Sequence, residues 1–169
     1  MKNSSKILAV AAVALMAVPV AHAATVTSDA TARIITPLNI SAGNSGLRFG
    51  EIVADASNNG TVTIAASNGQ ETCTTVQCLT SDRGAAAFNV TGEAQKTFTV
   101  SVPNSVTLNG TEASNTGQSM SSTLVASTAT ETLDNNGAAS FNVGGTLTVG
   151  AAQAVGAYSG SFVVTIDYQ

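Results

Sequence analysis

Apolar and polar residues alternate along most of the chain after residue 25. A period of two places successive side chains on opposite faces of a strand, so this pattern predicts half-buried β-strands. No segment after residue 23 shows the 3.6-residue spacing of an amphipathic helix. The alternation predicts strands at residues 61–64, 86–90, 97–102, 139–143 and 147–149, with one more near residues 120–125.

Short turn signals separate these runs. Asn59-Gly60, Asn68-Gly69 and Asn109-Gly110 fit tight reversals that need glycine or asparagine at positive φ. Gly144-Gly145 is also predicted to be a turn, between two strands. Many short strands at this spacing favour an all-β fold, an immunoglobulin-like Greek-key β-sandwich.

The sharpest alternation lies at the C-terminal end and predicts one long strand. A strand with a continuous apolar face invites pairing when it lies at an open sheet edge, so we expect another strand to cover it. The residues on this face, with the glycine that precedes them, are Gly156, Tyr158, Phe162, Val164, Ile166 and Tyr168.

An N-terminal segment is the candidate cover. Pro37 separates it from a second alternation at Leu38 and Ile40, because proline interrupts a strand ladder. The segment is either a strand donated to a neighbouring molecule or an ordinary edge strand of its own domain. Its inward-facing candidates are Val26, Ser28, Ala30, Ala32 and Ile34.

Residues 1–23 are typical of a signal peptide. Lys2 and Lys6 precede an apolar run at residues 7–20, and cleavage is expected between Ala23 and Ala24. Export is therefore predicted, through the periplasm to the cell surface or beyond. Without the two lysines, the chain has four basic and ten acidic residues, so its net charge is 4 − 10 = −6. Four scattered cations argue against nucleic acid as a partner.

Cys73 and Cys78 are the only cysteines. An even count in an exported chain predicts one disulfide, here closing a short loop. Such a loop stabilises by roughly 2 kcal/mol or less, so the bond is expected to clamp a hairpin or strand end. Free or redox-active thiols and a metal site are the alternatives, although a nearby histidine or carboxylate pair is absent.

The composition offers little catalytic chemistry. The one histidine, His22, lies in the predicted signal peptide, so the processed chain lacks the commonest general base. Asp134-Asn135-Asn136-Gly137 is predicted to be a plain turn rather than a calcium loop. We expect no enzyme activity, no catalytic or metal site and no cofactor.

Several tracts together resemble a bacterial family designated domain of unknown function 4402. The resemblance covers essentially the whole processed chain, but the family name implies no activity. The tracts lie at residues 30–38, 47–53, 88–93, 144–150 and 156–168.

The C-terminus is also similar to that of chaperone–usher pilins of Gram-negative bacteria. The shared features are a glycine fourteenth from the end (Gly156), alternating apolar residues and a penultimate tyrosine (Tyr168). This resemblance implies an incomplete sandwich, completed first by a periplasmic chaperone and then, at an outer-membrane usher, by the next subunit's N-terminal strand. The disulfide departs from theirs, since pilins commonly link two early strands.

The leading hypothesis is therefore a fimbrial structural subunit whose partners are identical or related subunits. Residues 1–23 would be the signal peptide, 24–35 the donor-strand extension and 36–169 a single β-sandwich domain. The alternative is a self-complete secreted sandwich that binds a ligand or partner through loops such as residues 111–132.

Overall fold

The computed structural model describes residues 23–43, 45–80 and 82–169, so the predicted signal peptide at residues 1–23 lies outside the described part except for its last residue. The chain divides into two units, Met1–Arg33 and Ile34–Gln169. In the first unit, residues 23–33 are exposed and form no strand. Within the described ranges, no helix is long and apolar enough to cross a membrane.

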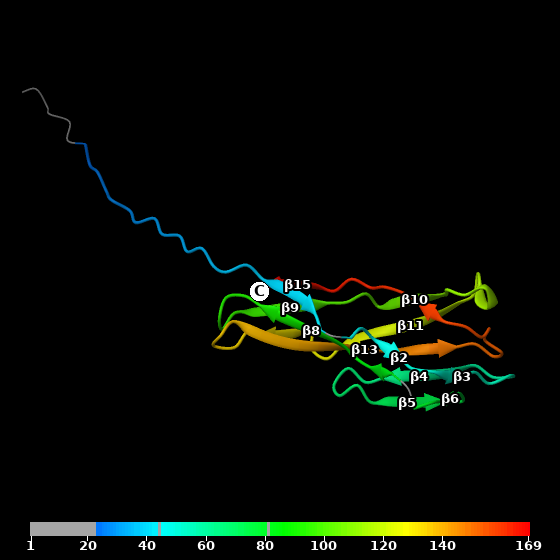
Figure 1. Cartoon of the computed structure of the whole chain (residues 1–169). Helices are drawn as coiled ribbons and strands as arrows, with labels where there is room; N and C mark the ends of the chain where they lie inside the picture. The colour runs from blue at the N-terminus through cyan, green and yellow to red at the C-terminus, as the bar shows by residue number, and fades with distance from the viewer. Residues whose placement is uncertain (1–22, 44, 81) are drawn as a thin grey trace, which may run out of the picture. The chain divides into compact units, whose positions relative to one another are not determined.

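The regular secondary structure of the second unit is almost all β-strand (Figure 1), as the alternation predicts. The described residues form one short 3-10 helix, η1 (Ala113–Asn115). The strands are β1 (Asn39–Ala42), β2 (Arg48–Phe49), β3 (Ile52–Val53), β4 (Gly60–Ile64), β5 (Glu71–Thr74), β6 (Gln77–Cys78), β7 (Arg83–Gly84), β8 (Ala86–Thr91), β9 (Thr97–Ser101), β10 (Ser105–Gly110), β11 (Ser119–Ala126), β12 (Thr130–Thr132), β13 (Ala138–Val149), β14 (Tyr158–Ser159) and β15 (Thr165–Tyr168).

Two larger sheets form a sandwich-like arrangement. The eight-stranded sheet has the order β1-β8-β13-β11-β10-β14, and β4 and β5 extend it beside β13. The three-stranded sheet has the order β12-β9-β15. Two small ladders, β2-β7 and β3-β6, complete the described strands. All of these pairs are antiparallel.

The longest strand, β13, organises the large sheet. Its first half pairs with β8, its second half pairs with β4, and β11 pairs along its other side. Gly144 and Gly145 lie inside this strand, so the prediction of a turn there was wrong. A Cβ at either position would overlap a carbonyl oxygen of a neighbouring strand, at Ile64 and Thr123 respectively. Glycine is needed here for close backbone approach rather than for chain reversal.

The core consists of two clusters. The first gathers around Phe98, Phe141 and Val143, and Phe88 and Phe141 stack with ring centroids 5.3 Å apart. The second gathers around Val62, Ile64 and Leu147. Leu47 packs against both clusters. These residues face inward because they occupy the apolar positions of the alternating strands, and their burial is the main stabilising term.

Candidate functional site: an apolar groove beside the C-terminal segment

The C-terminal apolar face does not lie on one strand. It divides into β14, which pairs with β10 in the large sheet, and β15, which pairs with β9 in the three-stranded sheet. The prediction of a single long strand was therefore wrong, because the segment passes from one sheet to the other. The alternation itself holds, since Phe162, Val164 and Ile166 are half-buried against the first core cluster while their odd-numbered neighbours are exposed.

Both C-terminal strands are edge strands. β14 ends the order of the large sheet, and β15 ends the order of the small one. The early strands β1, β2 and β3 pair with β8, β7 and β6 respectively. Within the described residues, therefore, no ladder joins the early strands to the C-terminal ones.

Hydrogen bonds join the early and the C-terminal segments near their ends. The Tyr168 hydroxyl donates to the Thr36 carbonyl (2.8 Å) and accepts from the Glu93 N–H (2.7 Å). At the other end, the Ala152 N–H donates to the Asp55 carbonyl (2.8 Å). These contacts fix the separation of the two segments and give Tyr168 a physical role in the fold.

A groove with a cavity volume of about 920 Å³ lies between the early segment and the C-terminal one. Residues 47–54 and Ala56 form one wall, and residues 152–158 form the other. The inner faces of β10, β11 and β13 form the floor through Leu108, Met120, Leu147 and Val149. Val53 and Val155 are 49% and 80% exposed, which leaves apolar surface open at the groove.

Two residues of the predicted C-terminal set shape this groove. Gly156 has φ 137°, and a Cβ there would lie 2.7 Å from the Asn115 amide nitrogen, so both conformation and packing require glycine. The Asn115 amide is buried and donates to the Ala157 carbonyl (2.7 Å). The Tyr158 hydroxyl donates to the Ala154 carbonyl (2.7 Å), which closes the turn in this wall.

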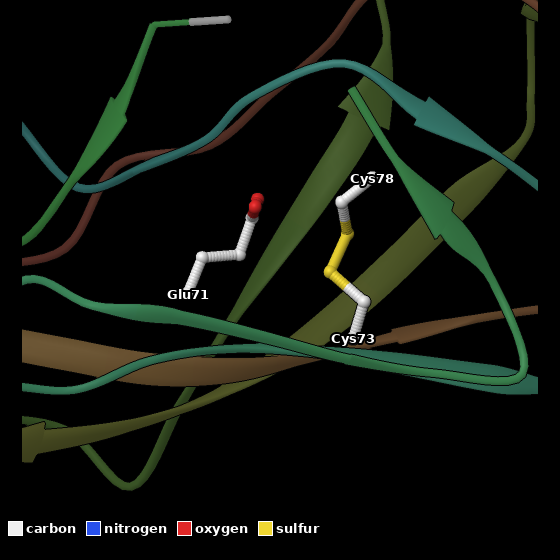
Figure 2. Close-up of side chains that lie close together, drawn as sticks. All are labelled: Glu71, Cys73 and Cys78. Carbon is white, nitrogen blue, oxygen red and sulfur yellow. A yellow bond between two sulfur atoms is a disulfide. The ribbon is translucent and has the colours of Figure 1, made fainter. Parts of the chain in front are cut away.

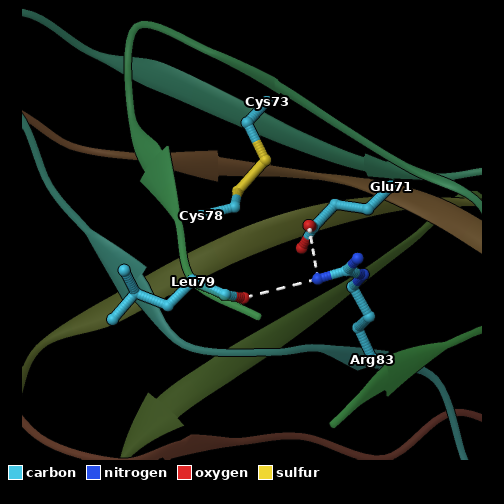
Figure 3. The surroundings of a disulfide bond; sticks show 5 residues. All are labelled: Glu71, Cys73, Cys78, Leu79 and Arg83. Atoms are coloured by element: carbon cyan, nitrogen blue, oxygen red, sulfur yellow. Dashed lines mark hydrogen bonds and ion pairs between the residues drawn. A yellow bond between two sulfur atoms is a disulfide. The ribbon is translucent and has the colours of Figure 1, made fainter. Parts of the chain in front are cut away.

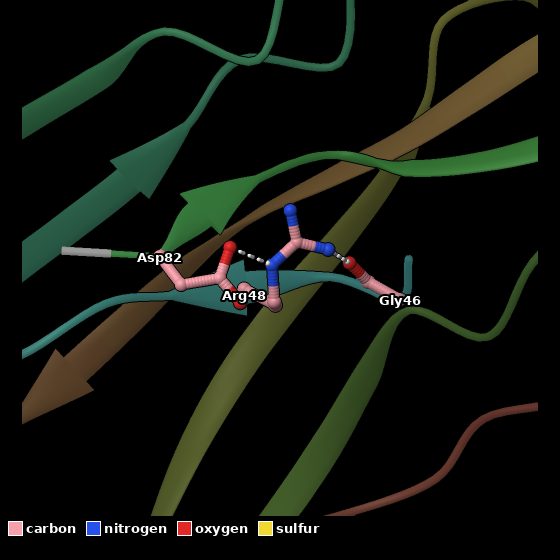
Figure 4. A network of polar contacts seen from close by, with 3 residues as sticks. All are labelled: Gly46, Arg48 and Asp82. Atoms are coloured by element: carbon pink, nitrogen blue, oxygen red, sulfur yellow. Dashed lines mark hydrogen bonds and ion pairs between the residues drawn. The ribbon is translucent and has the colours of Figure 1, made fainter. Parts of the chain in front are cut away.

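Three charged residues line the groove, Arg48, Glu51 and Asp82. The Arg48 guanidinium pairs with the Asp82 carboxylate (2.8 Å) and donates to the Gly46 carbonyl (3.0 Å; Figure 4). The rest of the lining is mostly aliphatic. Such a surface is suited to hold small apolar side chains in a dry contact. The alternation of apolar residues does not predict this wall, although residues 47–53 are among the tracts that carry the family resemblance.

The predicted disulfide is present. Cys73 on β5 is bonded to Cys78 on β6, with the Cα atoms 6.3 Å apart. The Glu71 carboxylate lies within 4.8 Å of both sulfur atoms (Figure 2). The three side chains together resemble a metal-ligand set, but metal binding needs thiolates, and sulfur atoms joined to each other supply none.

The N-terminal candidates lie in an extended, unpaired stretch. Residues 23–38 form no strand, and residues 23–37 are exposed. Val26 and Ile34 are 93% and 97% exposed. Ser28, Ala30 and Ala32 lie between them and are exposed as well. We call residues 24–34 the arm. Both alternatives for this segment, a donated strand and an own-domain edge strand, stay predictions.

Two exposed turns depend on carboxylates. The Asp134 side chain accepts hydrogen bonds from the N–H groups of Ala138 and Asn136, which lowers its pKa from the ordinary 3.8. The N–H groups of Ser57 and Asn58 lower the pKa of Asp55 in the same way. The predicted turn at residues 134–137 is thus an aspartate-capped turn, in which the side chain binds its own backbone.

These turns predict a loss of stability in acid. A folded-state pKa below the unfolded one stabilises the domain above about pH 4, and this contribution disappears as pH falls through the lowered pKa. We expect the melting temperature of the wild-type domain to fall more steeply below pH 4 than that of Asp134→Asn, which has no charge to lose. Calorimetric melts from pH 6 to pH 2.5 measure the difference, and parallel curves would contradict it.

The family model described as "Domain of unknown function (DUF4402)" matches residues 38–168, which include both groove walls. No curated protein and no solved structure is significantly similar to the chain.

Proposed function

This chain belongs to the DUF4402 family, whose description assigns no activity, and on that premise we propose that it is a structural subunit of a cell-surface fimbria. Each copy would lend its arm to the next copy. The observation that carries this proposal is the apolar groove between residues 47–56 and residues 152–158, in a chain that also has an exposed, alternating arm.

The dimensions of the arm and the groove support this assembly. Eleven extended residues span about 36 Å, which exceeds the reach of the ten-residue wall at residues 47–56. The even-numbered arm residues would face the groove floor, with Val26 and Ile34 contributing ~1.5–3 kcal/mol each on full burial. The three small residues between them suit a narrow groove, and ladder hydrogen bonds would add about 1 kcal/mol each.

The exposed apolar edge also supports a need for protection before assembly. An open edge strand with an apolar groove beside it is a site of unwanted pairing. A periplasmic chaperone that lends a strand, and an outer-membrane usher that exchanges it for the arm, are the partners we propose from the resemblance to pilins. The predicted signal peptide is consistent with this route, which ends at the cell surface.

Filling the groove tests the proposal. Ala154 lines the groove and is half-buried, whereas Ala151 is exposed and outside the lining. We expect the mature chain to form polymers that resist boiling and appear as a series of bands on gels. Ala154→Trp is expected to abolish them because the indole would occupy the space needed by the arm, while Ala151→Trp should assemble normally.

Both variants should melt as cooperatively as the wild type, since neither residue belongs to the buried core. A wild-type chain that remains a soluble, cooperatively melting monomer at high concentration would count against a fimbrial subunit. That result would favour the self-complete sandwich instead.

A further inference from the structure

One groove wall depends on a very small ladder. β3 lies in the wall, and its ladder partner in the described chain is β6, through the pairs Ile52–Cys78 and Val53–Gln77. The Leu79 N–H extends this ladder by donating to the Glu51 carbonyl (2.9 Å). Two-residue strands supply few hydrogen bonds, so this wall, which also packs Phe49 and Ile52 against the second core cluster, gains from support at β6.

The disulfide provides that support. β5 pairs with β4 and thereby belongs to the large sheet, whereas β6 pairs with β3 in a separate ladder. The Cys73–Cys78 bond joins β5 of the large sheet to β6 across the two-residue turn between them, and β6 in turn pairs with β3 of the groove wall (Figure 3). Cys73 lies opposite Val62, which is fully buried, so one end of the bond is anchored on the core.

A second, non-covalent link runs beside the first. The Arg83 guanidinium is 3.3 Å from the Glu71 carboxylate on β5 and donates to the Leu79 carbonyl (3.4 Å), as Figure 3 shows. The Glu71 side chain is only 8% exposed. Both contacts are long for hydrogen bonds, so they hold the wall less firmly than the covalent bond does.

We infer that the Cys73–Cys78 disulfide positions the groove wall and thereby makes the subunit able to accept a neighbour's arm. This inference rests on the proposed function and assigns the bond a role in assembly rather than in folding. The closed loop is short, so the bond removes little entropy from the unfolded chain and adds little to the stability of the whole domain. A subunit without the bond would keep its arm and could donate it, but its own groove wall would be displaced.

The experiment compares the mature chain with Cys73→Ala/Cys78→Ala. The double variant alone is expected to assemble at least about tenfold less well. A displaced wall that weakens binding of the arm by 1.4 kcal/mol already gives that factor. Added to wild type as a minor fraction, the variant should shorten the fibres seen by electron microscopy, because it donates its arm but cannot accept one.

Hydrogen exchange distinguishes a local displacement of the groove wall from unfolding of the whole domain. We expect faster exchange at the amides of β3 and Leu79 in the variant, with β13 still protected. Loss of protection throughout β13 would overturn the inference, because the bond would then hold the whole domain. Assembly of the variant at the wild-type rate would also overturn it and leave the proposed function intact. If the wild type itself does not assemble, the proposed function fails and the inference fails with it.

Discussion

Deleting residues 24–34 from the mature chain is expected to abolish fibre formation and leave a folded monomer. The arm residues are exposed and in no strand, so their removal takes little buried surface from the domain. Analytical ultracentrifugation should show a monomer, and its melting temperature should stay close to that of the full mature chain. A marked loss of stability would instead identify the segment as part of its own sandwich.

Single substitutions in the arm give a sharper version of this test. Ala32 and Thr31 are adjacent but lie on opposite faces of an extended chain. Ala32→Asp would place a carboxylate against the aliphatic groove floor, where an unpaired charge is strongly unfavourable. Thr31→Asp would place the same charge toward solvent. We expect the first variant to lose assembly and the second to retain it, and equal behaviour of the two would contradict strand insertion.

Gly144→Ala is expected to destabilise the domain by roughly 3 kcal/mol or more. The added Cβ would meet the Ile64 carbonyl, and it would also lie 2.5 Å from the Ala66 nitrogen. Both obstacles are backbone atoms of the chain paired beside β13, so no side-chain rotation can relieve them. Because small domains are stable by only about 5–15 kcal/mol, such a loss should be large in urea denaturation.

Gly46→Ala is the matched control for this substitution. An added Cβ at Gly46 has no heavy atom within 4 Å, and Gly46 is not among the glycines with positive φ. Its unfolding free energy should stay within about 0.5 kcal/mol of the wild type, as is usual for surface substitutions. If Gly144→Ala were equally mild, β13 would not be continuous through the glycine pair.

The contrast between β4 and the C-terminal segment shows which structural features the alternation predicts and which it does not. At β4, Val62 and Ile64 are buried, as their even positions predict. At residues 162–168 the even positions again face inward, but the predicted strand at residues 158–168 belongs to two sheets. Alternation specifies the face of a strand on which a side chain lies. It does not specify the neighbouring strand, because ladder hydrogen bonds use backbone groups that every residue carries.

The glycines show a second limit of the local pattern. Asn68-Gly69 does form a turn, with Gly69 at φ 68°, as its residue types predict. Gly144-Gly145 has the same local preference, yet both residues are buried within β13. A glycine that permits a turn and a glycine that permits close backbone approach look alike in sequence. Only the neighbouring strands distinguish them.

The sequence by itself determined the all-β class, the inward faces of most strands and the pairing of the two cysteines. These features follow from the order and types of nearby residues. The tertiary structure alone decided that the early and C-terminal segments flank an apolar groove, that residues 47–56 form one of its walls, and that the disulfide joins β5 of the large sheet to β6, which pairs with this wall. These features depend on contacts between residues far apart in the chain, which local periodicity does not encode.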